Sequence, residues 1–263
     1  MAAPLDLAQA LAFAHLLADE AGPIARRYFR QKLNVKNKPD QSPVTVADRE
    51  IEAHLRGLIR ARYPDHGILG EEQGRDGAER DCVWVLDPID GTKSFIAGMP
   101  LFGTLIALLH HGRAVLGLVD HPVLRERWIG RNPGGATLNG EPCRTSGCER
   151  LADAIVMTTS PDAYAPEDLA RFHRVSLQAR LRRFGGDCYM YALLASGHVD
   201  AVFGARLEPY DFMPMVALVQ AAGGVISDWQ GQPLSIDRYD GRVLVSASAA
   251  LHAQILRQLN APA

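Results

Sequence analysis

An apolar run that ends on two carboxylates constrains this chain more than any other stretch. The segment CVWVLDPIDGTKSF occupies residues 82–95, and residues 83–86 have the composition of a buried strand. Asp87 and Asp90 come next, in a turn stiffened by Pro88. Like charges held this close repel each other, and loss of solvent would raise their pKa values. A solvated turn is one interpretation. A divalent cation held by both carboxylates is the other.

Further carboxylates stand where predicted elements begin or end. Glu71 follows the β-like run 67–69, and Asp48, Asp187 and Asp211 lie at the starts of predicted helices. Each has an ordinary explanation, because acidic loops are common and Asp caps helices or favours their positive ends. Those explanations do not account for the combination of five separate segments that each present a carboxylate at an element end. Rigid scaffolds present ligands in this way.

The residues after Asp90 indicate an anion site beside these carboxylates. Gly91 and Thr92 offer backbone N–H groups and a hydroxyl, and a helical turn over KSFIAG would direct its positive end at a phosphate. Carboxylates next to such a cradle, without a general-base histidine, predict metal-assisted hydrolysis of a phosphate ester.

Composition limits the class of protein. The chain has 263 residues, 47% of them hydrophobic, enough for one large domain or two small ones. Its 28 Lys and Arg balance 30 Asp and Glu, so we expect no nucleic-acid partner. We expect no membrane partner and no signal peptide either, because no stretch has the required apolar pattern. The four cysteines lack framework spacing and the histidines lack zinc spacing, which predicts a cytoplasmic protein with oxygen ligands for any metal.

Periodicity predicts an α/β protein with two halves. Residues 1–150 form an α+β half with a largely antiparallel sheet, and residues 151–263 form a half of alternating strands and helices that carries Asp187 and Asp211. In the first half we expect helices from Asp6 to about Arg30 and over 46–64, strands at 67–69, 82–86, 102–109, 114–120 and 125–130, and a turn-rich segment at 131–151. In the second half we expect strands at 154–159, 200–203, 223–229 and 242–248, and helices at 166–181, 188–197 and 212–224.

Four blocks of the chain resemble the signature blocks of the inositol monophosphatase superfamily. They are SPVTVADRE, GEEQG, WVLDPIDGTKSF and EPYDFMPMVALVQAAGG, in the order and spacing that the family shows. The resemblance extends over residues 38–229. Within the superfamily, DGTKSFIAGMPLFGTLIALL, HPVLRERWIG and GGDCYMYALLASGHVD most resemble the histidinol-phosphatase branch. The resemblance implies a layered αβαβα sandwich, with the first half carrying most metal ligands, and a homodimer.

The resemblance also implies which residues hold the metal. Roughly two or three Mg²⁺ ions per active site would be bound by Glu71, Asp87, the carbonyl of Ile89, Asp90 and Asp211. The four carboxylates were already selected by their positions at element ends. The Ile89 carbonyl comes from the resemblance alone.

Catalytic roles follow from the same resemblance. Thr92 would help Glu71 to activate the attacking water, and Asp48 would orient Thr92. Lys38 lies in a loop that closes near the site in relatives. Metal-bound water is far more acidic than bulk water, so hydroxide could attack phosphorus in line near neutral pH. The substrate would contact Glu71, Asp90, Gly91 and Thr92.

Two positions bear on the choice of substrate. Asp187 stands where inositol-cleaving relatives carry a small apolar residue, and a carboxylate there favours a cationic ester such as histidinol phosphate. Many relatives have a substrate-touching Glu seven residues before the carboxylate that corresponds to Asp211, where this chain has Gly204. Glu208 either substitutes for it in binding substrate or is a solvated loop residue. Arg183 and Arg206 could reach a phosphate or lie on the surface.

The sequence therefore favours a Mg²⁺-dependent phosphomonoesterase, and foremost a histidinol-phosphatase of histidine biosynthesis. An inositol-1-monophosphatase, or another phosphatase of sugar or nucleotide phosphates, is the alternative within the superfamily. A non-catalytic binding module on the same scaffold is the alternative of a different class. Such a module should have lost a ligand, whereas all four carboxylates and Thr92 are present.

Overall fold

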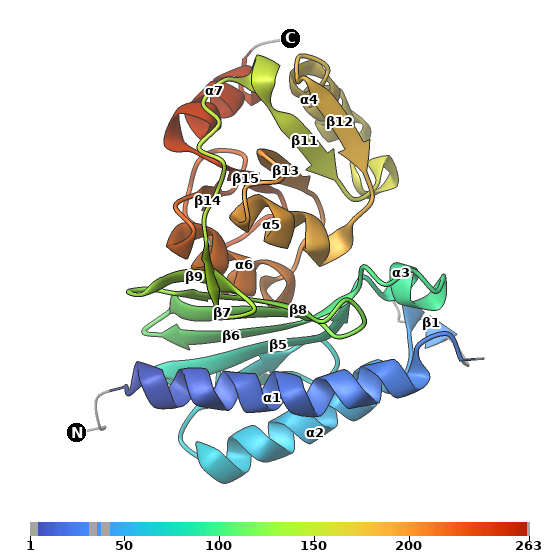
Figure 1. Cartoon of the computed structure of the whole chain (residues 1–263), viewed down its shortest axis with the longest axis vertical. Helices are drawn as coiled ribbons and strands as arrows, with labels where there is room; N and C mark the ends of the chain where they lie inside the picture. Colours follow the sequence, from blue (N-terminus) through green and yellow to red (C-terminus); the bar gives the residue numbers. More distant parts are fainter. Residues whose placement is uncertain (1–4, 32–35, 38–42, 262–263) are drawn as a thin grey trace.

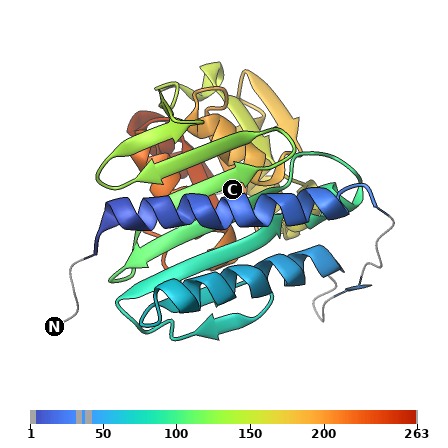
Figure 2. The same cartoon turned by 60° about the horizontal axis from the view of Figure 1, so that its bottom comes forward.

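Two helices lie side by side across one face of the larger sheet (Figures 1 and 2). The structure, a computed structural model, describes residues 5–31, 36–37 and 43–261. Helix α1 (Leu7–Tyr28) begins at the predicted cap Asp6, whose carboxylate accepts hydrogen bonds from the N–H groups of Ala8 and Gln9. Helix α2 (Val46–Arg62) follows a pair of short antiparallel strands, β1 (Lys36–Asn37) and β2 (Pro43–Val44).

The larger sheet has eight strands in the order β10-β9-β8-β7-β6-β5-β3-β4. All neighbouring pairs are antiparallel except β3 and β5, so the prediction of a largely antiparallel sheet is confirmed. Its strands are β3 (Gly67–Gly70), β4 (Gly74–Asp76), β5 (Cys82–Asp90), β6 (Gly103–His110), β7 (Arg113–His121), β8 (Glu126–Arg131), β9 (Gly135–Leu138) and β10 (Glu141–Cys143). The short helix α3 (Thr92–Ile96) directly follows β5.

The second sheet has five strands in the order β12-β11-β13-β15-β14. Strand β11 is parallel to β12 and β13, whereas β15 is antiparallel to both of its neighbours. The strands are β11 (Ile155–Thr158), β12 (Leu181–Phe184), β13 (Ala201–Gly204), β14 (Val225–Ser227) and β15 (Val243–Ser246). Two single 3₁₀ turns, η1 (Leu151–Asp153) and η2 (Pro161–Ala163), flank β11.

Helices α5 (Asp187–Ala195) and α6 (Pro209–Ala221) lie between the two sheets (Figure 1). They are apolar on all sides, as expected for helices that sheets cover on both faces. Helices α4 (Pro166–Ser176) and α7 (Ala249–Leu259) cover the outer face of the smaller sheet. The order of layers is therefore helix, sheet, helix, sheet, helix, and the predicted layered α/β fold is confirmed. The division at residue 150 into two halves stays a prediction.

Two short strands were not predicted, and one helix boundary was wrong. The segment 131–151 is turn-rich as predicted, but its turns connect two short hairpins that add β9 and β10 to the sheet. The helix predicted over 166–181 ends at Ser176, and Leu181 begins the exposed edge strand β12. The arginines of residues 180–183 suit a helix by propensity, but parallel pairing with β11 decides their conformation.

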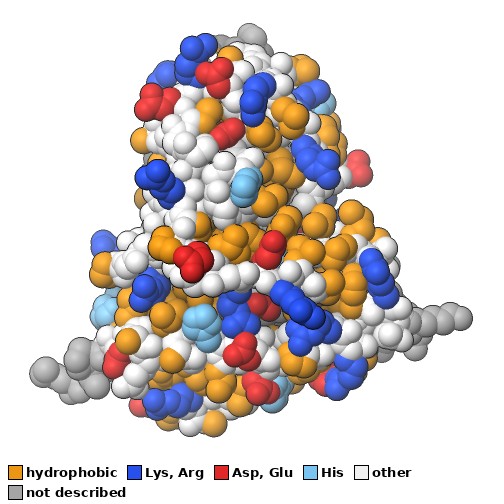
Figure 3. Space-filling view, viewed as in Figure 1, with side chains coloured by type: hydrophobic (Ala, Val, Ile, Leu, Met, Phe, Trp, Pro, Cys, Tyr) orange, Lys and Arg blue, Asp and Glu red, His pale blue; other side chains and the backbone are white. Residues whose placement is uncertain are grey.

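Charged side chains of both signs are mixed over the face shown in Figure 3. None of the helices among the described residues combines the length and apolar composition that crossing a bilayer requires.

Candidate active site

A bulge at the end of β5 presents the first two carboxylates. Asp87 pairs with Leu105 of β6, but Asp90, three residues on, pairs with Gly103, so one extra residue is inserted. Bulges of this kind redirect side chains. The N–H of Ile89 donates to Asp87 Oδ1 at 3.1 Å, and the N–H of Cys188 donates to Asp90 Oδ2 at 2.7 Å. Each carboxylate therefore has one oxygen fixed by the backbone.

A helix start presents the third carboxylate. Asp211 lies in the first turn of α6, where its Oδ2 accepts the N–H of Glu208 at 2.8 Å. Asp87, Asp90 and Asp211 each offer an oxygen, and these oxygens lie within 4.8 Å of one another. The residues come from segments more than a hundred positions apart, yet their carboxylates converge on one point. Asp211 is not the N-cap of α6, which is Glu208, but it also serves its own helix as the N3 residue of a capping box.

These carboxylates crowd negative charge into a buried space. Burial, reinforced by the charges of Glu71, Asp90 and Asp211, raises the pKa of Asp87 well above its ordinary value. Burial and the charge of Asp187 raise the pKa of Asp90 to about 7, although the Cys188 N–H opposes the shift. Burial and the charge of Asp90 likewise raise the pKa of Asp211. A cation would remove the repulsion that raises all three.

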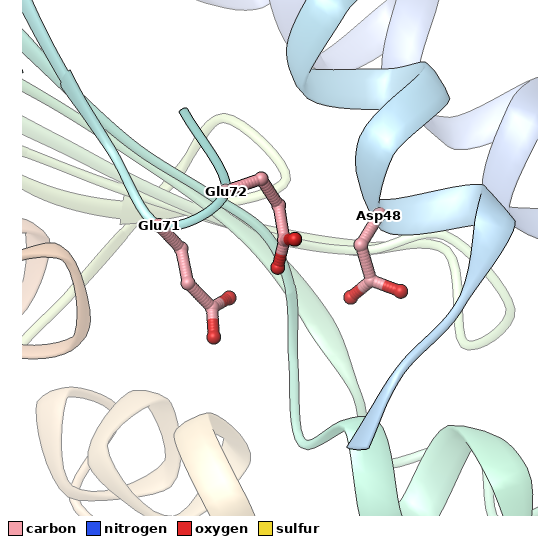
Figure 4. A group of neighbouring side chains, drawn as sticks. All are labelled: Asp48, Glu71 and Glu72. Atoms are coloured by element: carbon pink, nitrogen blue, oxygen red, sulfur yellow. The ribbon is translucent and has the colours of Figure 1, made fainter. Parts of the chain in front are cut away.

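A second group of carboxylates adjoins the first. Asp48, Glu71 and Glu72 each offer an oxygen, again within 4.8 Å of one another, and Figure 4 shows their side chains pointing into the space between α2 and the loop after β3. The N–H of Glu71 donates to the carbonyl of Leu86 at 3.2 Å, which places Glu71 beside the end of β5. The charge of Glu71 raises the pKa values of residues in both groups. Glu71 therefore joins the two groups into one acidic site.

Asp48 and Thr92 have partners other than each other. Asp48 Oδ2 accepts hydrogen bonds from the N–H and the hydroxyl of Thr45, the N-cap of α2. Burial raises the pKa of Asp48 to about 6, against the lowering effect of Thr45. The hydroxyl of Thr92 donates to the carbonyl of Ile89 at 3.3 Å. The relay in which Asp48 orients Thr92 for Glu71 stays a prediction.

Asp187 lies at the border of this site, at the first position of α5. The hydroxyl of Ser94 donates to Asp187 Oδ2 at 2.5 Å. Gly91, at φ +86°, passes so close that a Cβ there would lie 3.0 Å from the Cβ of Asp187. Burial raises the pKa of Asp187, while Ser94 and Lys93 lower it. Asp187 is thus held next to Asp90 by residues of the segment that follows β5.

The structure gives a steric reason for Gly204. A Cβ at this position would lie 2.6 Å from Leu207 Cδ1 and 2.7 Å from the hydroxyl oxygen of Tyr191, so a larger side chain requires both of these side chains to shift. Glu208 is the N-cap of α6, and its Oε2 accepts the hydroxyl of Tyr239 at 2.5 Å. Its predicted contact with substrate stays a prediction.

Arg183, Arg206 and Lys38 are the remaining residues that the sequence analysis named. Arg183 and Arg206 are exposed. Lys38 lies outside the described residues.

Sequence reasoning missed Glu52 and Arg56, which support the acidic loop. Both side chains are buried, and Arg56 Nε donates to Glu52 Oε1 at 2.8 Å. Glu52 also accepts the N–H groups of Glu72 and Gln73 at 2.7 and 2.9 Å. The pair thereby fixes the backbone next to Glu71. A signal was present, because Asp48, Glu52 and Arg56 recur at intervals of four along the edge of the apolar face of α2.

The donor set fits a hard divalent cation. All the groups that converge are carboxylates, which Mg²⁺, Ca²⁺ and Mn²⁺ prefer and which thiolate-seeking metals do not. The raised pKa values of Asp87, Asp90 and Asp211 show that, among the described residues, no cation compensates the charges of these three carboxylates.

Comparisons with known proteins agree with this geometry. Residues 6–261 match the model of the inositol monophosphatase family. The chain is 44% identical over 262 residues to the bifunctional phosphatase IMPL2 of Arabidopsis thaliana, covering 97% of this chain and 76% of that protein. It is 36% identical over 242 residues to the histidinol-phosphatase of Chlorobaculum parvum, covering 91% and 92% of the two chains. An inositol monophosphatase structure from Zymomonas mobilis superposes with a TM-score of 0.89 at 40% identity, covering 98% of this chain and 100% of that one.

Proposed function

Because this chain belongs to the inositol monophosphatase family, and is thus a phosphatase of small phosphate esters, we propose that it is a histidinol-phosphatase. The reaction is the hydrolysis of L-histidinol phosphate to L-histidinol and phosphate, as in histidine biosynthesis. Members of the family generally depend on Mg²⁺, and the acidic groups described above suit that ion.

The observation that carries the proposal is the carboxylate of Asp187 beside Asp90. Burial raises the pKa of Asp187, so this group gains from a positive partner that compensates its desolvation. Histidinol phosphate has an ammonium group and an imidazole that can become charged, whereas inositol phosphate has neither. A charge-assisted hydrogen bond from the ammonium group to Asp187 would therefore select the cationic ester.

The other site residues would bind the cations or act on the attacking water. When bound, divalent cations supply positive charge that polarises the phosphate ester and acidifies water. Glu71, Asp87, Asp90 and Asp211 would hold them, with the carbonyl of Ile89. Glu71 would accept the proton of the water that attacks phosphorus in line. Thr92, next to the carbonyl of Ile89, would orient that water.

An inositol monophosphatase is the second candidate. It is favoured by the inositol monophosphatase of Zymomonas mobilis, whose structure is 40% identical in sequence to this chain. The two candidates differ in whether a positive substrate group is required. A cytoplasmic location and a homodimer stay predictions under either one.

A panel of esters decides between the candidates. Release of inorganic phosphate is measured with Mg²⁺ from histidinol phosphate, inositol 1-phosphate and a nucleoside monophosphate. We expect the highest kcat/KM for histidinol phosphate. A higher kcat/KM for inositol 1-phosphate would overturn the proposal.

Asp187→Asn tests the selecting residue. The substitution keeps the shape and removes the charge, so the preference for histidinol phosphate over inositol 1-phosphate should fall by about tenfold, as expected for one hydrogen bond to a charged group. The loss should lie mainly in KM for the cationic ester. Asp153→Asn is the matched control, since Asp153 is an exposed carboxylate paired only with Arg150. Equal preferences in the two variants would exclude Asp187 as the selector.

A further inference from the structure

A groove lies between α1 and the strands β7, β8 and β9. Its volume is about 610 Å³. None of the carboxylates of the acidic site lines it. Figure 3 shows basic, acidic and histidine side chains along helix α1 on this face of the molecule. We call it the arginine groove because its lining includes Arg26, Arg125, Arg127 and Arg131.

The acidic residues of the groove are already engaged. Arg127 Nε donates to Asp120 Oδ1 at 2.7 Å, and its Nη2 donates to Asp19 Oδ1 at 2.8 Å. Burial and the charge of Arg127 lower the pKa of His15, so this lining residue adds no positive charge at neutral pH. Four arginines against two aspartates leave the groove with an excess of two positive charges.

Three of the arginines have no acidic partner of their own. Among the residues that the structure describes, no carboxylate lies within ion-pair distance of Arg26, Arg125 or Arg131. Arg26 Nη1 makes only a 3.4 Å contact with the carbonyl of Pro122. Guanidinium groups that line one groove and have no ion pair of their own provide the planar donors that phosphate oxygens accept.

The backbone around Arg125 is held in place by the facing turn. Arg125 has φ +59°, and its N–H donates to the carbonyl of His121 at 2.9 Å. Its carbonyl accepts Asn139 Nδ2 at 3.1 Å, and Asn139 Oδ1 accepts the N–H of Arg127 at 2.9 Å. The backbone at Arg125 and at the neighbouring Arg127 is therefore fixed before a ligand binds. Such preorganisation reduces the entropy lost on binding.

We propose that the arginine groove is a second binding site, for a small multivalent phosphate anion held by Arg26, Arg125 and Arg131. The site does not depend on the proposed function, since it shares no residue with the acidic site. The pairing of Arg127 with two aspartates fixes the floor of the groove and leaves the other three guanidinium groups for the ligand.

The test uses inorganic pyrophosphate as the probe and isothermal titration calorimetry as the readout. The full chain is kept in EDTA, because a metal-free acidic site repels anions and cannot contribute to the heat. The wild-type protein should bind pyrophosphate. The double variant Arg125→Gln/Arg131→Gln should bind it at least about tenfold more weakly, because two hydrogen bonds to a charged ligand are lost.

A matched double variant removes the same charge elsewhere. Arg113 and Arg150 are exposed and do not line the groove, so Arg113→Gln/Arg150→Gln should change the affinity less than about twofold. Absence of binding by the wild-type protein would overturn the proposal. So would an equal loss in both double variants, since it would show attraction by net charge alone. Thermal unfolding of each variant verifies that the fold is retained.

Discussion

Buried carboxylates occur on both sides of the loop that follows β3, and the protein treats the two sides differently. On one side Glu52 is fully buried, but the charge of Arg56 neutralises it and two backbone N–H groups donate hydrogen bonds to it. On the other side Asp87, Asp90 and Asp211 converge, and each receives one backbone N–H.

This difference indicates the role of the acidic site. The fold is able to supply an arginine to a buried carboxylate, as it does for Glu52. Among the residues that the structure describes, it supplies none to Asp87, Asp90 or Asp211, and burial together with their mutual repulsion raises their pKa values. A protein keeps such a costly arrangement where an external cation completes it. The backbone N–H groups orient the carboxylates without cancelling their charge.

We call Asp87, Asp90 and Asp211 the uncompensated group. Removing one of its charges should change activity and stability most strongly. Asp90→Asn should lower kcat/KM for phosphate release by at least about 100-fold, because even residues behind metal ligands contribute 10- to 100-fold. It should also weaken the stabilisation by Mg²⁺. A ligand at a hundred times its Kd stabilises by about 2.7 kcal/mol, which in a chain of this size raises Tm by roughly 5–10 °C.

The measurements are phosphate release and Tm, each with Mg²⁺ and with EDTA. In EDTA the variant should be no less stable than the wild type, since it has lost a repelling charge. Undiminished hydrolysis by a folded Asp90→Asn protein would contradict the catalytic assignment, and with it the contrast between the two groups. It would also favour the alternative of a non-catalytic binding module.

Glu52 and Arg56 form the neutralised group, and removing one of its charges should have the next largest effect, on the free energy of unfolding. Glu52→Gln leaves Arg56 buried without its counter-charge, and breaking a buried pair costs about 3–5 kcal/mol. The free energy of unfolding from urea denaturation measures this loss. The double variant Glu52→Gln/Arg56→Met should recover part of the loss, because no buried charge remains. Asp76→Asn is the control, since Asp76 pairs with Arg60 on the same helix in solvent and little change is expected.

The two groups also differ in how far they could be predicted from sequence. Asp87 and Asp90 were found because their signal is local, an apolar run followed by acids in a stiff turn. Asp48 and Asp211 were found at helix starts, and each accepts the N–H of its N-cap residue, so one side chain serves both the helix and the site. Local sequence patterns therefore predict site residues that lie at the ends of helices and strands.

Contacts between residues that are distant in the sequence could not be predicted from local patterns. Glu52 bonds to residues twenty positions away, and Ser94 bonds to Asp187 across 93 positions. Such pairs exist only once β3 has paired with β5 and α5 has entered the space between the sheets. The bulge at Asp87–Asp90 likewise needs the register of β6. The predicted helix extended to Leu181, the first residue of β12, because pairing with β11 and not local composition defines this edge strand.

The smallest effect is a pH dependence of stability that comes from Asp90. The pKa of Asp90 is raised from 3.8 to about 7, so the folded protein keeps this proton over a range in which the unfolded chain has lost it. The resulting stability is present below about pH 4 and is lost as the pH rises through 7. In EDTA, the Tm of the wild type relative to Asp90→Asn should therefore fall between pH 5 and pH 8.

Asp90→Asn serves as the reference for the wild type, because groups other than Asp90 titrate in the same pH range in both proteins. Burial lowers the pKa values of His121 and His252 to about 4, which makes both proteins less stable as the pH falls below 6.5. That contribution is common to the two proteins and cancels in the difference. Mg²⁺ should reverse the trend in the wild type, because the ion binds the deprotonated carboxylate. A pH-independent difference in EDTA would mean that Asp90 is compensated after all, as Glu52 is.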